Sequence, residues 1–195
     1  MTITYTPAPT VNAGADLTIC QNNSVVSLAG VGSVSVASGG VWTATPAGGT
    51  FAPNANFGTV STFTPSAGQI SAGTFTLTLT TTGNGSCNAV SDVITVTVAP
   101  TPTVSAGSDQ SACKNNPVIT LTGTSSTTAG TWTSLSGTPG TFSNANLLVG
   151  GTYTPSATEL LGSSVTLRLT TTSNGSCTAV FDDMVINFTS PPVVN

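Results

Sequence analysis

Charge is scarce in this chain of 195 residues, and histidine is absent. Only 4% of the residues are charged, against about 25% in an ordinary globular protein. The two cations, Lys114 and Arg168, cannot form the basic face that binds phosphate backbones, so we expect no nucleic-acid partner. Without histidine the chain also lacks the usual general base, proton shuttle and nitrogen ligand for metals. These absences exclude most catalytic chemistry.

Long apolar runs are missing as well. No stretch approaches the ~20 apolar residues of a membrane-spanning helix, and the N-terminal Met1–Thr4 has none of the features of a signal peptide. We therefore expect no membrane insertion in this fragment and interpret it as a piece of a longer protein. The net charge of −4 gives only a weak field over a chain of this length and says little about partners.

Hydroxylated residues take the place of the missing charges. The chain contains 39 Thr and 24 Ser, beside 21 Gly and 12 Pro. Threonine is β-branched and fits a half-buried pleated surface, so the composition predicts an all-β protein. A hydrophobic content of 38% is enough for a thin core and is too rich in β-branched residues for a disordered tail.

The same pattern occurs twice along the chain. Asn12–Asp16 matches Ser105–Asp109 at an offset of 93 positions, whereas Trp42 matches Trp132 at an offset of 90. We expect the three missing residues to lie in a loop between strands, near residues 31–40. Further matched pairs are Cys20/Cys113, Leu28/Leu121, Gly30/Gly123, Phe63/Tyr153, Leu79/Leu169 and Cys87/Cys177.

Fragments of the pattern also occur at both ends, where residues 3–7 resemble residues 96–100. Proline-rich joints separate the copies, and because proline favours extended chain these joints should be short and semi-rigid. We predict residues 1–8 as the last strand and linker of a preceding repeat, 9–100 as repeat 1, 101–190 as repeat 2, and 191–195 as the start of the next repeat.

Alternation of apolar and polar residues predicts about seven short strands in each repeat. The clearest has Phe75, Leu77 and Leu79 on one face and threonines on the other. A single helical turn is expected near Pro65–Ile70. Seven strands with a tryptophan on the third predict two tandem seven-stranded immunoglobulin-like β-sandwiches, with each tryptophan in a core. The strands of repeat 1 are predicted near Thr10–Ala13 with Leu17–Cys20, Val25–Ala29, Val41–Ala44, Thr50–Phe51, Val60–Thr64, Thr74–Thr82 and Asp92–Val98.

Each repeat has two cysteines, at matching positions. Because they avoid catalytic spacings, we expect one structural disulfide inside each repeat, Cys20–Cys87 and Cys113–Cys177. Closing a loop of about 65 residues would stabilise the fold by ~4 kcal/mol in the chain-entropy model. Two cysteines without histidine cannot complete a zinc site within a repeat, so we expect no metal and no cofactor.

Six carboxylates remain as candidates for chemistry: Asp16, Asp92, Asp109, Glu159, Asp182 and Asp183. Asp16/Asp109 and Asp92/Asp182 recur in both repeats, which indicates a role in the module rather than in a unique active site. Hydrogen bonding at turns and strand ends explains them best. A calcium site at one end of the sandwich is the alternative, because that ion takes carboxylate and carbonyl oxygens. No catalytic residue is expected, and we expect the protein not to be an enzyme.

Several segments resemble the repeats of large Bacteroidetes cell-surface adhesins, in particular adhesins of gliding motility. The resemblance covers essentially the whole chain twice, and the segments that carry it in repeat 1 are Asn12–Cys20, Gly40–Trp42, Phe63–Pro65 and Thr78–Cys87. The Ala-Gly-x-Asp opening is also similar to PKD domains, although their Trp-Asp-Phe-Gly-Asp-Gly segment is absent after Trp42 and Trp132. The resemblance implies a very long protein secreted across the outer membrane.

Three functions follow as hypotheses. The first is a non-catalytic structural repeat of a long surface filament that spaces and presents adhesive regions, with neighbouring repeats of the same chain as partners. The second is a module whose loops or threonine-rich faces bind surface polysaccharide. The third is a spacer in a secreted hydrolase. All three place the chain outside the cell, and the first places it on the cell surface.

Overall fold

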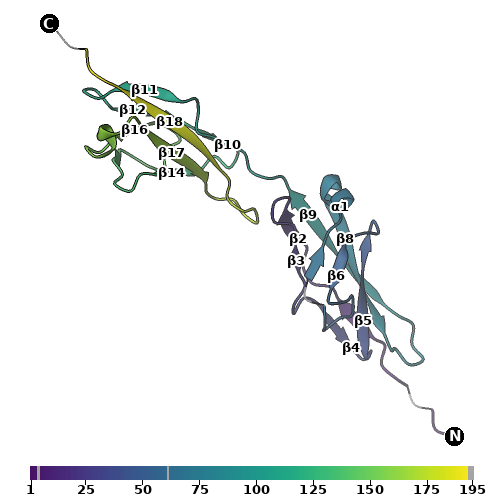
Figure 1. Ribbon diagram of the computed structural model, residues 1–195. Helices are drawn as coiled ribbons and strands as arrows, with labels where there is room; N and C mark the ends of the chain where they lie inside the picture. Colours follow the sequence, from purple (N-terminus) through teal and green to yellow (C-terminus); the bar gives the residue numbers. More distant parts are fainter. Residues whose placement is uncertain (4, 61, 193–195) are drawn as a thin grey trace. The chain divides into compact units, whose positions relative to one another are not determined.

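Short β-strands in which apolar and polar residues alternate make up most of the molecule. The computed structural model describes residues 1–3, 5–60 and 62–192 (Figure 1). Contacts between residues divide the chain into two compact units, Met1–Thr101 and Pro102–Asn195. The division falls one residue after the joint expected from the sequence. The units are called unit 1 and unit 2 below, and each is described by itself.

The described residues of unit 1 form nine short strands and one short helix. Seven of the strands form two sheets, of order β2-β9-β8-β5 and β3-β7-β6, and the remaining two form a small ribbon, β1-β4. The elements are β1 (Thr10–Asn12), β2 (Leu17–Cys20), β3 (Val26–Ser27), β4 (Ser33–Ser35), β5 (Gly39–Thr45), β6 (Thr50–Ala52), β7 (Thr62–Thr64), α1 (Ala67–Ala72), β8 (Thr74–Thr82) and β9 (Ser91–Ala99).

Unit 2 repeats this arrangement with the same strand orders, β11-β18-β17-β14, β12-β16-β15 and the ribbon β10-β13. Its elements are β10 (Val104–Ser105), β11 (Gln110–Cys113), β12 (Ile119–Thr122), β13 (Thr124–Ser125), β14 (Gly130–Ser134), β15 (Thr141–Phe142), β16 (Val149–Thr154), the 3-10 turn η1 (Glu159–Leu161), β17 (Ser164–Thr171) and β18 (Phe181–Thr189). The prediction of an all-β, immunoglobulin-like sandwich is confirmed.

The core of each unit lies between its two sheets. In unit 1, Leu77 and Leu79 of β8 are completely buried, as their alternation with threonine predicts, and Trp42 of β5 packs in the same cluster. Phe63 of β7 contacts Phe75 of β8 across the two sheets, with ring centroids 5.7 Å apart. Trp132 is buried in the equivalent cluster of unit 2, so both tryptophans are core residues.

Each unit contains a parallel pair of strands in its larger sheet. β2 pairs in parallel with β9, and Cys20 at the end of β2 lies opposite Ala99 at the end of β9. β11 and β18 pair in the same way in unit 2, with Cys113 opposite Thr189. The other strand pairs in the described part of the chain are antiparallel. The first and last strands of the main sheet therefore run side by side in one direction.

Three details differ from the expectation. The first predicted strand is two strands in different sheets, β1 and β2, because Gly14 at φ 101° turns the chain between them. The region expected to be a loop between strands contains β4, which pairs with β1. Residues 1–8, expected to be the last strand and linker of a preceding repeat, form no regular structure in their described part.

The start of a next repeat, expected at 191–195, lies mostly outside the described residues. The predicted helical turn is present as α1, where Ser66 and Gln69 cap each other in a reciprocal box. In the described part of the chain, no helix is long and apolar enough to cross a membrane.

Candidate functional site

The recurring aspartates hold the start of each unit against its last strand. Asp92 of β9 accepts a hydrogen bond from the Ala13 backbone N–H (2.8 Å), and Asp16 accepts one from the Thr95 N–H of β9 (2.7 Å). The two carboxylates thus tie the β1–β2 segment to β9 from both sides. The hydrogen-bonding role predicted for them is confirmed.

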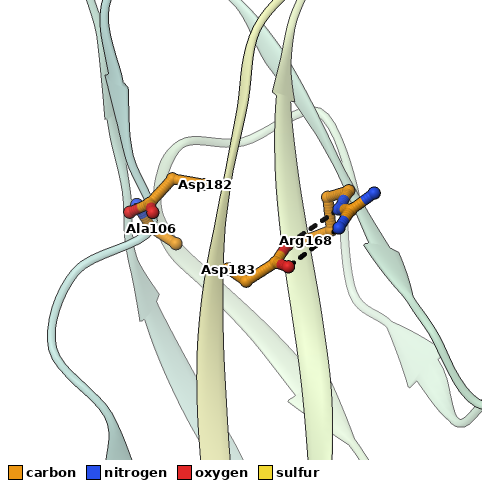
Figure 2. A network of polar contacts seen from close by, with 4 residues as sticks. All are labelled: Ala106, Arg168, Asp182 and Asp183. Atoms are coloured by element: carbon orange, nitrogen blue, oxygen red, sulfur yellow. Dashed lines mark hydrogen bonds and ion pairs between the residues drawn. The ribbon is translucent and has the colours of Figure 1, made fainter.

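Unit 2 repeats the same two contacts. Asp182 of β18 accepts from the Ala106 N–H at 2.8 Å, and Asp109 accepts from the Val185 N–H at 2.9 Å. Figure 2 shows Asp182 beside Ala106. Each of the four carboxylates thus accepts from a different backbone donor, and the calcium alternative stays a prediction. No group of three or more Asp, Glu, Cys or His that could hold a metal occurs among the residues described.

Glu159 is a buried carboxylate that belongs to unit 2 only. Its side chain is 6% exposed and accepts hydrogen bonds from the hydroxyls of Tyr153 (2.7 Å) and Ser134 (2.8 Å) and from the backbone N–H of Ser156 (2.8 Å). Burial by itself raises the pKa of Glu159, but these hydrogen bonds together lower that pKa below its ordinary value of 4.5. The side chain is therefore an ionised, fully bonded anchor rather than a free base.

Tyr153 is the other half of this buried pair. Its hydroxyl donates to Glu159 and accepts from the Gly140 backbone N–H (2.8 Å), so it joins η1 to the loop before β15. Burial first, and the hydrogen bond to the Glu159 carboxylate after it, raise the pKa of Tyr153 above its ordinary value of 10.0. The pairing of Tyr153 with Glu159 was not predicted from the sequence, although the Ser-x-x-Glu spacing of Ser156 and Glu159 is a helix-start signal that could have located it.

A second charged contact lies on the outer face of unit 2. Arg168 of β17 lies opposite Asp183 of β18 and binds both its carboxylate oxygens, at 2.8 Å each (Figure 2). The guanidinium also lies over the Phe181 ring, 3.6 Å from its centroid. Hydrogen bonding to Arg168 lowers the pKa of Asp183 below its usual range. Arg168, Asp183 and Phe181 thus pack together on the surface and link β17 to β18. They are called the surface clamp below.

The cysteines lie at the two ends of each unit. Cys20 closes β2 next to the end of β9, and its Sγ lies 3.7 Å from the carbonyl oxygen of Pro100. Cys87 lies in the β8–β9 connection, before β9 begins, and its Sγ lies 3.9 Å from the carbonyl oxygen of Pro7. Cys87 and Cys113 are free thiols.

The predicted disulfides Cys20–Cys87 and Cys113–Cys177 are therefore wrong. The nine residues of β9 separate Cys20 from Cys87, which places them about 27 Å apart along the sheet at ~3.4 Å per residue. A disulfide needs Cα atoms only about 5.5–6 Å apart. β18 separates Cys113 from Cys177 in the same way. Strand direction, which alternates along the chain, is the signal that would have shown this.

Both cysteine positions are held by tight turns. Cys20 and Asn23 exchange two backbone hydrogen bonds, and the N–H of Asn116 donates to the carbonyl of Cys113 (2.9 Å) in the matching turn. At the other end, the N–H of Cys87 donates to Asn84 (3.1 Å), and that of Cys177 donates to Asn174 (2.9 Å). The Asn-Gly-Ser stretches before Cys87 and Cys177 therefore form tight turns, and the backbone around each cysteine is fixed by hydrogen bonds.

Comparison with known proteins gives a likeness of fold. No protein-family model matches the sequence, and no curated protein matches it. Among solved structures, the human desmocollin-1 ectodomain is 12% identical over 93% of this chain, with a TM-score of 0.37. The insect immune protein hemolin is 12% identical over 95% (TM-score 0.45), and domains 1–5 of Sidekick-1 are 14% identical over 94% (TM-score 0.42). This chain spans 42%, 48% and 39% of those three chains, respectively.

Proposed function

We propose that the chain is a structural repeat region of a long extracellular adhesin of bacterial gliding motility, which spaces and presents adhesive regions on the cell surface. The observation that carries the proposal is the polarity of each unit. In unit 1 the incoming segment at Pro7 lies beside the β8–β9 connection, and the chain leaves at Pro100, beside the opposite end of the same strand. A unit that is entered at one end and left at the other adds its length to a string of repeats.

The internal contacts of the units suit a load-bearing spacer. Each has a continuous apolar core between two sheets, and paired aspartates fasten its first strands to its last. A nine-residue strand such as β9 contributes roughly 30 Å of length. The low charge content suits a fibre exposed to variable salt, because screening has few charges on which to act.

The non-enzymatic part of the proposal rests on the carboxylates. Asp16, Asp92, Asp109 and Asp182 each accept a backbone hydrogen bond, Asp183 is paired with Arg168, and Glu159 is bonded to hydroxyls. A catalytic carboxylate must instead face the position of a substrate. Side chains that are committed to holding strands together favour a structural role.

Labelled beads on living cells test the gliding proposal. Antibodies raised against the whole chain would be attached to beads and applied to the gliding cells that produce it, with beads carrying non-immune antibody as the control. We expect beads that travel along the cell. Beads that bind but stay in place would replace the gliding role by that of a static stalk. Antigen found only in the medium would support the spacer of a secreted hydrolase instead.

A further inference from the structure

A pocket of about 320 Å³ lies at one end of the larger sheet of unit 2, where β14 ends, η1 turns and β17 begins. All of its lining residues belong to unit 2. Its volume is near the lower end of the range of about 300–1,000 Å³ that small-molecule sites occupy. The pocket therefore has room for one small ligand, such as a single sugar ring.

The wall of this pocket combines hydroxyl groups, apolar groups and one carboxylate. The carboxylate belongs to Glu159, whose side chain is 6% exposed, and the apolar part comes from Leu135 and Val165. The hydroxyl groups are those of Ser136, Thr158, Ser164 and Thr166. A ligand that complements this wall offers hydroxyl groups, some C–H surface and a positive charge.

The negative charge of Glu159 is not balanced by its bonded partners. This carboxylate is ionised at neutral pH, since its hydrogen bonds outweigh the effect of burial on its pKa. The donors are hydroxyls and a backbone N–H, all of them neutral. Arg168 is bonded to Asp183, and Lys114, in the turn after β11, forms no ion pair with Glu159 among the described residues. Because buried charges are usually paired, the pocket beside this carboxylate favours a cationic group.

The polar groups of the pocket are not required by the fold, as unit 1 shows. Two of the hydroxyls and the carboxylate have no counterpart there, because the residues 90 places earlier are Pro46, Gly68 and Gln69. Gln69 is neutral and donates to the Pro46 carbonyl (2.7 Å). Both units nevertheless have the same strand orders. The chemistry of the pocket therefore belongs to unit 2 and not to the module, which favours a binding role over a structural one.

We propose that this pocket of unit 2 binds an amino sugar, with the protonated amine of a hexosamine ring facing Glu159. The hydroxyls of the sugar exchange hydrogen bonds with the serine and threonine side chains, and a C–H face of the ring lies against Leu135. An ionised partner strengthens such contacts in a partly desolvated site. The inference goes beyond the proposed function, because a spacer needs no ligand of its own.

Matched sugars provide the first test. Glucosamine carries an ammonium group where glucose has a hydroxyl, and the labelled full chain would be titrated with each at slightly acidic pH, followed by the NMR signals of its backbone amides. We expect glucosamine to shift the amides of Leu135, Ser136 and Thr166, and glucose to bind about tenfold more weakly. Equal binding of both sugars, or shifts only elsewhere, would overturn the proposal. Ethylammonium that binds as tightly as glucosamine would overturn the assignment to a sugar.

Variants of the pocket provide the second test. Glu159→Gln installs the neutral residue of unit 1 and should weaken glucosamine binding about tenfold. Thr166→Lys places a cation in the pocket while keeping Glu159, and should abolish binding. Thr76→Lys makes the same change at the matching position of unit 1 and should leave binding unaltered. Full affinity in both pocket variants would contradict the proposal. Sugar binding is measured on the isolated chain and bead movement on cells, so each proposal can fail without the other.

Discussion

The two units share a backbone and differ in how they fill one buried position. Unit 1 places Phe63 where unit 2 has Tyr153, and both side chains are completely buried. Gln69 of unit 1 is 1% exposed and donates to the Pro46 carbonyl (2.7 Å), whereas Glu159 at the same place accepts from the Tyr153 hydroxyl (2.7 Å). The substitutions are matched: a buried carboxylate occurs only where a hydroxyl is available to satisfy it.

The outer faces of the two units also differ by a matched pair of substitutions. At the strand positions where unit 2 pairs Arg168 with Asp183, unit 1 pairs Thr78 with Val93. Nearby in unit 1, the hydroxyls of Thr80 and Ser91 share a hydrogen bond of 2.8 Å. The features that do not vary between the units include the tryptophan, the two recurring aspartates and the two cysteines. The comparison therefore separates what the module requires from what one copy can change.

The largest effect should follow from breaking the buried pair of unit 2. Tyr153→Phe removes the hydroxyl and leaves the Glu159 carboxylate short of a donor, which should destabilise unit 2 by about 1–3 kcal/mol. Urea unfolding would be followed by Trp132 fluorescence in a Trp42→Phe background, which silences unit 1. Tyr5→Phe, at a side chain 90% exposed, is the matched control.

The double change Tyr153→Phe with Glu159→Gln gives unit 2 the side chains of unit 1. It should recover part of the stability that the single change removes, because a neutral amide costs less to bury than an unpaired carboxylate. An unfolding midpoint unaltered by Tyr153→Phe would contradict the importance of the pair.

A smaller effect should appear as a difference in pH dependence between the units. Because the pKa of Glu159 is lowered on folding, its contribution is complete above its ordinary pKa of 4.5 and is lost as the pH falls through the folded value. Because the pKa of Tyr153 is raised, its contribution is complete below 10.0 and is lost as the pH rises through the folded value. Unit 1 has neither group at this place.

Thermal melting curves at pH values from ~2 to ~12 would measure this difference in variants that retain one tryptophan at a time. Trp42 alone reports unit 1, and Trp132 alone reports unit 2. We expect the midpoint of unit 2 to fall at both extremes relative to that of unit 1, and Glu159→Gln to reduce the acid-side difference, to which Asp183 also contributes. Parallel curves for the two units at both extremes would speak against the assignment.

The smallest effect should come from the surface clamp. Arg168→Thr installs the residue of unit 1 and should lower the melting temperature of unit 2 slightly at low salt, with a difference that shrinks as salt is added. The double change Arg168→Thr with Asp183→Val completes the conversion and closes a mutant cycle with the two single changes. A loss that persists at high salt would indicate packing against Phe181 rather than charge pairing.

Strand positions could be predicted from the sequence because alternation is a local signal. Phe75, Leu77 and Leu79 show the pattern clearly, and their burial follows it. β4 escaped prediction because its three residues Ser33–Ser35 are too few to show alternation and depend on pairing with β1. Short strands whose partners decide their structure are not readable from their own residues.

The place where unit 2 is three residues shorter than unit 1 was also not readable from the sequence alone. The sequence pattern pairs Gly30 with Gly123. In the structure, however, Gly32 has the surroundings in unit 1 that Gly123 has in unit 2. A Cβ at Gly32 would lie 2.8 Å from the Asn12 carbonyl and 3.2 Å from Leu79, and one at Gly123 would press on the equivalent Ser105 and Leu169. A motif of three letters cannot distinguish two glycines so close together, whereas packing against the core can.

The parallel pairing of β2 with β9 has a mechanical consequence. Tension along the chain pulls the start of β2 toward one end of the unit and the end of β9 toward the other. Their four paired positions, from Leu17 opposite Val96 to Cys20 opposite Ala99, then slide past one another and resist together instead of opening one by one. A repeat loaded in this direction is sheared rather than unzipped, and it yields only when all of these pairs rupture at once.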